Sequence, residues 1–108
     1  MNNVLAQLPE DTSMEHFSDI IKSENVRIER IVSYGQSSPE HGWYNQEEHE
    51  WVMVLSGYGI IEFESGEVMR LESGDFLNIQ AGRKHRVVTT SADEATIWLA
   101  VFYRQKDY

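Results

Sequence analysis

From residue 26 onward, short runs of alternating apolar and polar residues follow one another, separated by turns that contain glycine. A period of two is typical of strands that bury one face. Val26 and Ile28, for example, alternate with Arg27 and Glu29. Several short strands separated by glycine turns predict an all-β sandwich or barrel. The strands expected after the first one cover residues 50–55, 60–64, 67–71, 75–79, 85–90 and 95–103.

The segment before residue 26 has a different pattern, with apolar residues spaced as on one face of a helix. Thr12 and Glu15 are placed as a capping box at the start of that helix. The apolar positions are Met14, Phe17, Ile20 and Ile21. Their spacing predicts a short N-terminal helix over residues 12–24, lying as a flank on a β-barrel formed by residues 26–103.

Two of the expected strands are apolar on both faces. Val52 shares one face with Glu50, whereas Trp51 and Met53 share the other, and residues 97–103 are continuously apolar. A barrel on its own would leave one of these faces in water, and large exposed apolar patches usually mark a contact with a partner. We therefore expect a homodimer, with the N-terminal helix covering the rest of the apolar surface.

Composition limits the class of protein. The 108 residues fit a single domain over residues 1–108, with 41% hydrophobic and 25% charged residues. No apolar run approaches the roughly 20 residues that span a bilayer, and the N-terminus lacks the pattern of a secretory signal. A cytoplasmic protein without membrane contact is expected. The absence of cysteine excludes disulfides and thiolate metal sites. The net charge of −9 argues against nucleic-acid binding.

Glycines and one histidine are regularly placed in two regions of the chain. In the second region, Gly74 is followed after five residues by Gln80, then by Gly82 and His85 at fixed intervals. In the first region, Tyr44 and Gln46 precede Glu50, and Gly57 follows it after six residues. Each glycine alone would mean little, and the joint spacing is much more specific.

Together these two regions resemble the paired motifs of the cupin family. The family has histidines where this chain has Tyr44 and Gln46, a proline where it has Gln80, and an asparagine where it has Thr89. The resemblance implies a double-stranded antiparallel β-helix, also called a jelly-roll barrel. It also implies a site inside the barrel, where cupins usually hold a metal ion with three histidines and one glutamate.

The candidate site can also be argued from strand geometry. Residues of equal parity on a strand point to the same side, so Tyr44, Gln46 and Glu50 can share the barrel interior, with His85 on a later strand opposite them. An imidazole, a carboxylate and an amide oxygen that converge can bind a divalent transition metal such as Fe, Mn, Ni or Zn. The predicted ligands are Glu50, His85 and Gln46, with Tyr44 and His49 as further candidates.

The other histidines and a simpler alternative bear on this prediction. His49 adjoins Glu50, so it points away from the interior unless a β-bulge turns it inward. His41 is expected in a loop and His16 on the polar face of the helix, and neither is expected to bind a metal. Glu50 and His85 can also form a hydrogen-bonded pair without any ion, because a buried carboxylate needs a partner.

Three functions therefore remain open at the level of sequence. The first is a metal-dependent enzyme acting on a small polar metabolite. The second is a non-catalytic module that binds a small molecule through Gln46, Glu50 and His85 without a metal. The third is a structural homodimer that serves another protein, with Trp51 and the last strand at its interface. The specific activity is left unassigned, because one fold supports many functions.

Overall fold

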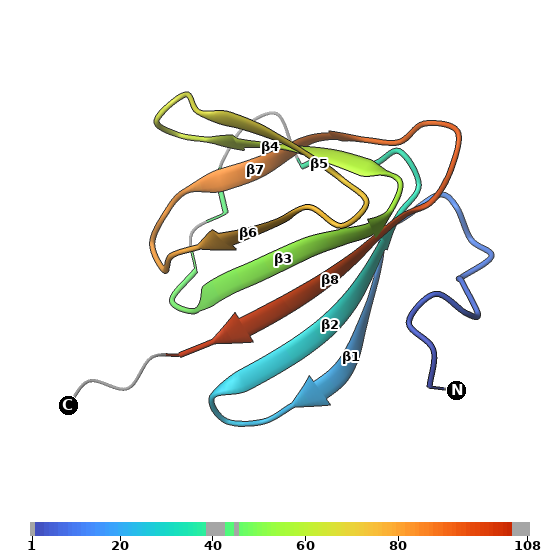
Figure 1. The fold of residues 1–108 in the computed structure, drawn as a ribbon, viewed down its shortest axis with the longest axis horizontal. Helices are drawn as coiled ribbons and strands as arrows, with labels where there is room; N and C mark the ends of the chain where they lie inside the picture. Colours follow the sequence, from blue (N-terminus) through green and yellow to red (C-terminus); the bar gives the residue numbers. More distant parts are fainter. Residues whose placement is uncertain (1, 39–42, 45, 105–108) are drawn as a thin grey trace.

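The computed structural model describes residues 2–38, 43–44 and 46–104. Their strands form two antiparallel sheets that face each other (Figure 1). The five-stranded sheet has the order β1-β2-β8-β3-β6, and the three-stranded sheet has the order β5-β4-β7. The strands are β1 (His16–Lys22), β2 (Val26–Ser33), β3 (His49–Ser56), β4 (Tyr58–Phe63), β5 (Val68–Glu72), β6 (Phe76–Ile79), β7 (His85–Thr90) and β8 (Thr96–Tyr103). The all-β cupin-type architecture expected from the sequence is confirmed.

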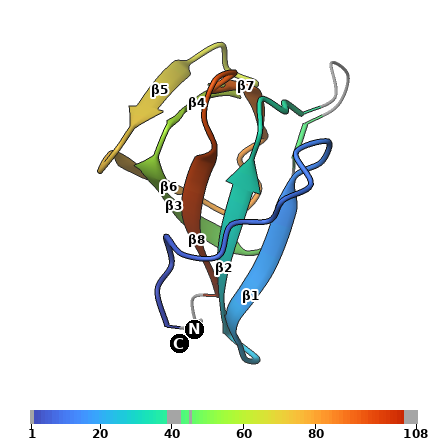
Figure 2. The ribbon, with the colours of Figure 1, turned by 90° about the vertical axis from the view of Figure 1, so that its right-hand side faces the viewer.

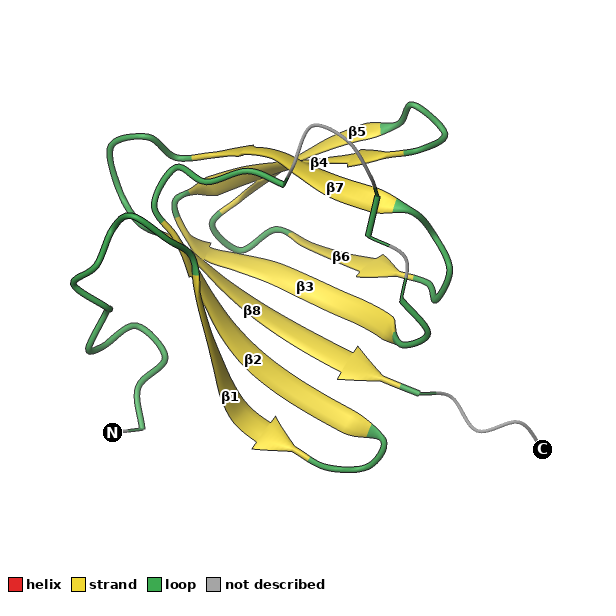
Figure 3. Cartoon of the chain, turned by 180° about the vertical axis from the view of Figure 1, so that it is seen from behind, coloured by secondary structure: helices red, strands yellow, loops and turns green. Residues whose placement is uncertain are grey.

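The hydrophobic core lies between the two sheets. Strand β4 shows the expected alternation, with Gly59, Ile61 and Phe63 buried and the residues between them half-buried. Facing these, β3 and β8 contribute Val54 and Ala100, both with 0% exposure. Strand β1 is the edge strand of the five-stranded sheet opposite β6. The two sheets diverge toward β1 (Figures 1 and 3).

The predicted N-terminal helix over residues 12–24 is wrong: the described residues form no helix, and this segment contains β1. Strand β1 pairs antiparallel with β2, and their register shifts between Asp19 and Ile21. Because a bulge at this point breaks the period of two, the apolar residues acquire a spacing close to that of a helix. The free edge of β2 also offers backbone hydrogen bonds to a segment rich in Phe and Ile, which favour strands.

The expected capping box is not formed either. Glu15 instead accepts a hydrogen bond from the hydroxyl of Ser33 at 2.8 Å. The amide of Ser13 donates to the side chain of Asp11 at 2.9 Å, which closes a local turn before β1. The apolar side chains assigned to the buried face of a helix remain largely exposed in this arrangement. They are Met14, Phe17, Ile20 and Ile21.

The described part of the N-terminal segment that precedes β1 contains no helix. It runs beside β1 and β2 (Figure 2), where the guanidinium of Arg30 donates to the carbonyl of Ala6 at 2.7 Å. The outer faces of β3 and β6 keep apolar side chains, with the rings of Trp51 and Phe76 5.6 Å apart. Phe76 is 63% exposed. The homodimer that would bury this face stays a prediction. No helix among the described residues is long and apolar enough to cross a membrane.

Candidate functional site

A cavity of about 190 Å³ lies between the two sheets. Its wall includes side chains from β1, β2, β3, β4, β7 and β8, together with residues of the segment that precedes β3. A larger hollow of about 400 Å³ lies along the N-terminal segment, but its charged residue, Arg30, is already bonded to backbone carbonyls. The interior cavity is therefore the candidate site. It is lined by Glu15, Phe17, Glu29, Ile31, Ser38, Tyr44, Gln46, Glu50, Val52, Ile61, His85, Val87, Trp98 and Phe102.

The fold brings the predicted residues Tyr44, Gln46, Glu50 and His85 to this one cavity. Glu50 is the second residue of β3, and His85 begins β7 in the opposite sheet. A β-bridge joins Tyr44 to His85, with the amide of Tyr44 donating to the carbonyl of His85 at 2.7 Å. The carbonyl of Gln46 accepts from the amide of Gly82 at 3.0 Å. The segment before β3 is thereby fixed against the start of β7.

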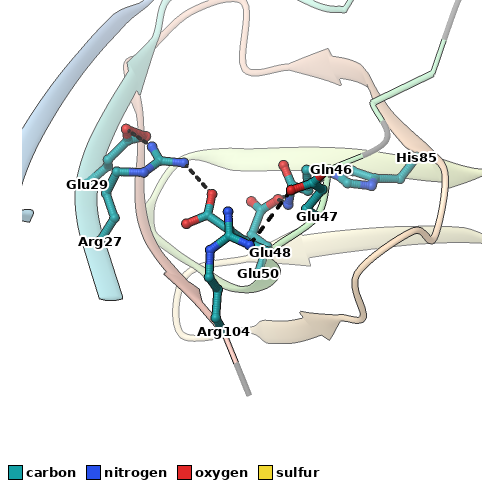
Figure 4. A network of polar contacts seen from close by, with 8 residues as sticks. All are labelled: Arg27, Glu29, Gln46, Glu47, Glu48, Glu50, His85 and Arg104. Carbon is teal, nitrogen blue, oxygen red and sulfur yellow. Dashed lines mark hydrogen bonds and ion pairs between the residues drawn. The ribbon is translucent and has the colours of Figure 1, made fainter. Parts of the chain in front are cut away.

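Glu50 is the centre of the polar contacts inside the cavity. The side-chain amide of Gln46 donates to Glu50 Oε1 at 3.0 Å, and His85 Nε2 lies 3.4 Å from the same oxygen (Figure 4). On the other side of the ring, His85 Nδ1 lies 2.9 Å from the carbonyl oxygen of Arg83. Since a carbonyl only accepts, Nδ1 carries a proton. Nε2 is then the nitrogen that gains or loses a proton beside Glu50.

The pKa of His85 is raised above its ordinary value of 6.5. Burial makes the largest contribution and lowers the pKa, because His85 is only 4% exposed. The hydrogen bond to the Glu50 carboxylate, the Arg83 carbonyl and the negative charge of Glu50 together outweigh burial. When the imidazole is protonated, it forms an ion pair with Glu50.

We predict that Glu50→Gln lowers the pKa of His85 below 6.5, because burial then acts without the carboxylate. An NMR titration of the His85 ring proton measures this directly. In the unaltered protein the folded pKa exceeds the unfolded one, so the pair stabilises the fold fully below about pH 6.5. That stabilisation is lost as the pH rises through the folded pKa. An unchanged His85 pKa in the variant would contradict this coupling.

The predicted metal site depends on the donor atoms that the cavity provides. Protein sites for transition metals use at least three protein donors, and structural zinc sites use four. Here Glu50 and His85 converge, but Gln46 turns its NH₂ group toward the carboxylate. The described residues contain no group of three or more His, Asp or Glu suited to an ion. This donor set does not fit the Fe, Mn, Ni or Zn site expected from the sequence.

The two other histidines in the described part of the chain do not complete the set. His49 Nδ1 accepts a hydrogen bond from the amide of Ala81 at 3.0 Å, and its ring lies 5.1 Å from that of Tyr103. These contacts hold His49 outside the cavity lining. His16 lies on β1, where Nε2 is 2.6 Å from the carbonyl of Asp11. His41 falls outside the described residues.

Strand β2 adds an ionic cluster that the sequence analysis missed. Arg27 Nη1 binds Glu29 at 2.5 Å, and Arg27 Nη2 binds Glu48 at 3.0 Å (Figure 4). The guanidinium also lies 4.1 Å above the ring of Phe102. Glu29 is 8% exposed and lines the cavity. Burial is the main cause that raises the pKa of its carboxyl, whereas the charge of Arg27 lowers it.

At the start of β2 the charged residues of the alternation, and not the apolar ones, face the interior. Arg27 and Glu29 point inward, whereas Val26 is 37% exposed and Ile28 is paired with Val101 on the outer face. A signal for this was present in the sequence, because Arg27 and Glu29 lie two residues apart on one strand face with opposite charges. An ion pair of this kind can turn toward an interior that contains other polar groups.

Two antiparallel sheets that enclose a small polar site define a barrel of the cupin type. The cupin domain profile matches residues 30–102, and the chain therefore belongs to the cupin family. A protein of Ralstonia eutropha JMP134, described as a "putative mannose-6-phosphate isomerase", is 38% identical with a TM-score of 0.92. The match covers 97% of this chain and 98% of that one. The comparison with curated proteins found no match.

More distant structures share the fold alone. A cupin superfamily protein of Desulfitobacterium hafniense DCB-2 is 15% identical with a TM-score of 0.76, over 91% of this chain and 84% of that chain. A Streptococcus pyogenes protein of unknown function is 20% identical with a TM-score of 0.71, over 90% of this chain and 80% of that chain. At these identities the similarity supports the architecture and carries no information about activity.

Proposed function

We propose that this cupin barrel is a module that binds a small molecule in its interior cavity without a metal ion. The observation that carries the proposal is the convergence of Gln46, Glu50 and His85 on one cavity whose other walls are largely apolar. Small-molecule sites are typically built in this way, with apolar walls for affinity and a few polar groups for orientation. The volume of about 190 Å³ suits a ligand smaller than a typical drug.

The polar groups of the cavity can make different contacts with a ligand. Glu50 accepts hydrogen bonds, and within the described residues both of its contacts end on Oε1. Its second oxygen, Oε2, is left to receive a donor from a ligand. Tyr44 is 50% exposed and lies beside His85, with ring centres 5.9 Å apart, so its ring can contact a bound molecule. Val52 and Ile61 supply the apolar floor.

The description of the Ralstonia relative suggests an isomerase acting on a sugar phosphate, which this cavity does not favour. A phosphate group is usually bound by Arg, Lys or backbone amides. No Lys or Arg lines the cavity among the described residues. Arg27 lies close by but directs its two terminal nitrogens to Glu29 and Glu48. A catalytic role is therefore not part of the proposal.

An NMR screen with a mixed set of small amines, alcohols, carboxylates and sugar phosphates tests the proposal. We expect shift changes confined to cavity residues for at least one compound. Ile31→Phe should abolish them by filling the cavity. Ile28→Phe, on the outer face of the same strand, should leave them intact. Absence of binding across all four compound classes, or equal loss in both variants, would refute a ligand site in the cavity.

A further inference from the structure

We infer that the ligand of this cavity is a small organic cation, an amine or a quaternary ammonium ion. The inference rests on the proposed binding function and names the chemical class that the cavity recognises. Three features of the wall support the inference. They are the sign of its charges, the aromatic rings among its residues, and the guanidinium group of this chain that lies over one of those rings.

The charged side chains of the wall are mainly acidic. Glu15, Glu29 and Glu50 line the cavity, and the described lining contains no Lys or Arg. The guanidinium of Arg27 is shared between Glu29 and the nearby Glu48, so this cluster keeps an excess of acid. In a partly enclosed cavity the effective dielectric is lower than in bulk water, so such charges attract a cation and repel an anion more strongly there.

Aromatic rings make up a large part of the remaining wall. Phe17, Tyr44, Trp98 and Phe102 all line the cavity. Phe17 is 61% exposed and Tyr44 is 50% exposed, so both rings are accessible from outside. The negative face of an aromatic ring attracts an ammonium group, and cages of such rings recognise quaternary ammonium ligands. The combination of rings and carboxylates therefore selects for positive charge on an apolar body.

One side chain of this protein, Arg27, already combines contacts to carboxylates and to an aromatic ring. The guanidinium of Arg27 lies 4.1 Å from the centre of the Phe102 ring and is bonded to Glu29 and Glu48. The same wall thus already holds one organic cation between carboxylates and an aromatic face. A ligand cation near Glu50 would have a carboxylate beside it, and the ring of Tyr44, 5.9 Å from that of His85, lines the same cavity.

A bound cation would also change the state of His85. In the free protein His85 lies 3.4 Å from Glu50 and forms an ion pair with it when protonated. A ligand ammonium that approaches Glu50 replaces this imidazolium as the partner of the carboxylate. Besides Glu50, the charged groups of the cavity lining are Glu15 beside β1 and Glu29 on β2, and Tyr44 faces the ring. The guanidinium of Arg83, before β7, also acts on His85 and disfavours its protonated form. Binding should therefore release a proton and tighten as the pH rises through the pKa of His85.

The test compares choline with 3,3-dimethylbutan-1-ol, its uncharged isostere, by calorimetry and NMR on the full chain, alongside simple primary amines and inorganic phosphate. We expect the amine class to bind at least about tenfold more tightly than the isostere. Affinity should fall with added salt. Glu50→Gln should remove most of the preference for choline over its uncharged isostere. Glu94 is an exposed acid outside the cavity, so Glu94→Gln should leave that preference unchanged. The NMR pKa of His85 should fall in the complex.

The outcomes separate this inference from the proposed function. Equal binding of choline and its isostere, or cavity binding of phosphate in preference to amines, would overturn the cationic ligand and leave the binding module standing. Binding that is insensitive to Ile31→Phe would place the ligand elsewhere and overturn both. Failure of every compound class in the screen would also overturn both.

Discussion

Replacing Gly57 with alanine is expected to destabilise the protein by about 3 kcal/mol, one of the two largest effects predicted for this chain. Gly57 joins β3 to β4 with a φ of +77°, a conformation that side chains rarely adopt. A Cβ atom there would lie 2.8 Å from the carbonyl oxygen of Ala95 and 2.9 Å from Thr96 Cα. Both are backbone atoms of the β8 region, so they cannot move aside without shifting the strand.

Gly74→Ala is the matched control. Gly74 also has a positive φ, +91°, but a Cβ atom built on it meets nothing within 4 Å. Only the backbone cost remains, about 1 kcal/mol. Urea unfolding of both variants measures the difference, expected at about 2 kcal/mol. Equal destabilisation would show that φ alone matters at Gly57 and that the close approach of β8 does not.

The second large effect is expected at the ionic cluster of β2. Arg27→Met should cost about 2 kcal/mol at pH 7, between the values typical of exposed and of fully buried ion pairs. The reason is that Glu29, 8% exposed, would lose the cation that balances its charge. Adding Glu29→Gln to this variant should recover a large part of the loss, since the uncompensated carboxylate is then removed.

The pH dependence gives an independent check of this cluster. Burial raises the folded pKa of Glu29 above its ordinary value of 4.5, and Arg27 opposes this rise. A raised folded pKa means that the contribution of Glu29 to stability is present below about pH 4.5 and is lost as the pH rises through the folded pKa. Removing Arg27 raises that pKa further. The loss in free energy of unfolding caused by Arg27→Met should thus be small near pH 4 and grow toward pH 7.

A surface pair provides the control for the Arg27 variant. Arg104 lies 3.8 Å from Glu47, with side-chain exposures of 48% and 89%. Exposed pairs contribute little, so Arg104→Met should change stability by less than about 0.5 kcal/mol. A comparable loss in both variants, without dependence on pH, would contradict the inward placement of Arg27.

The sequence was sufficient for much of the fold and for the centre of the candidate site. Glycines at the turns and alternating strands predicted the barrel, and the resemblance to the cupin motifs together with strand parity placed Glu50 and His85 on strands that can face one another. The distance of 3.4 Å between His85 Nε2 and Glu50 Oε1 agrees with that expectation. Such features depend on local rules, namely the parity of side chains on a strand and the conformations that glycine permits.

Other features were beyond the reach of local rules. A bulge near Ile20 gave β1 a helix-like spacing, and only pairing with the free edge of β2 determines that it is a strand. The same holds for the inward turn of Arg27 and Glu29, which is stable because Glu48 and the Phe102 ring meet the guanidinium there.

What the sequence by itself determined is the succession of strands and turns from residue 26 onward, together with the spacing that marks Glu50 and His85 as candidates, because these follow from patterns along the chain. What only the tertiary structure decided is which partner each polar group meets. The donor set at Glu50, the ionic cluster on β2 and the acidic, aromatic cavity wall all depend on residues far apart in sequence. Contacts of this kind are fixed by packing between sheets, and no pattern within one segment contains them.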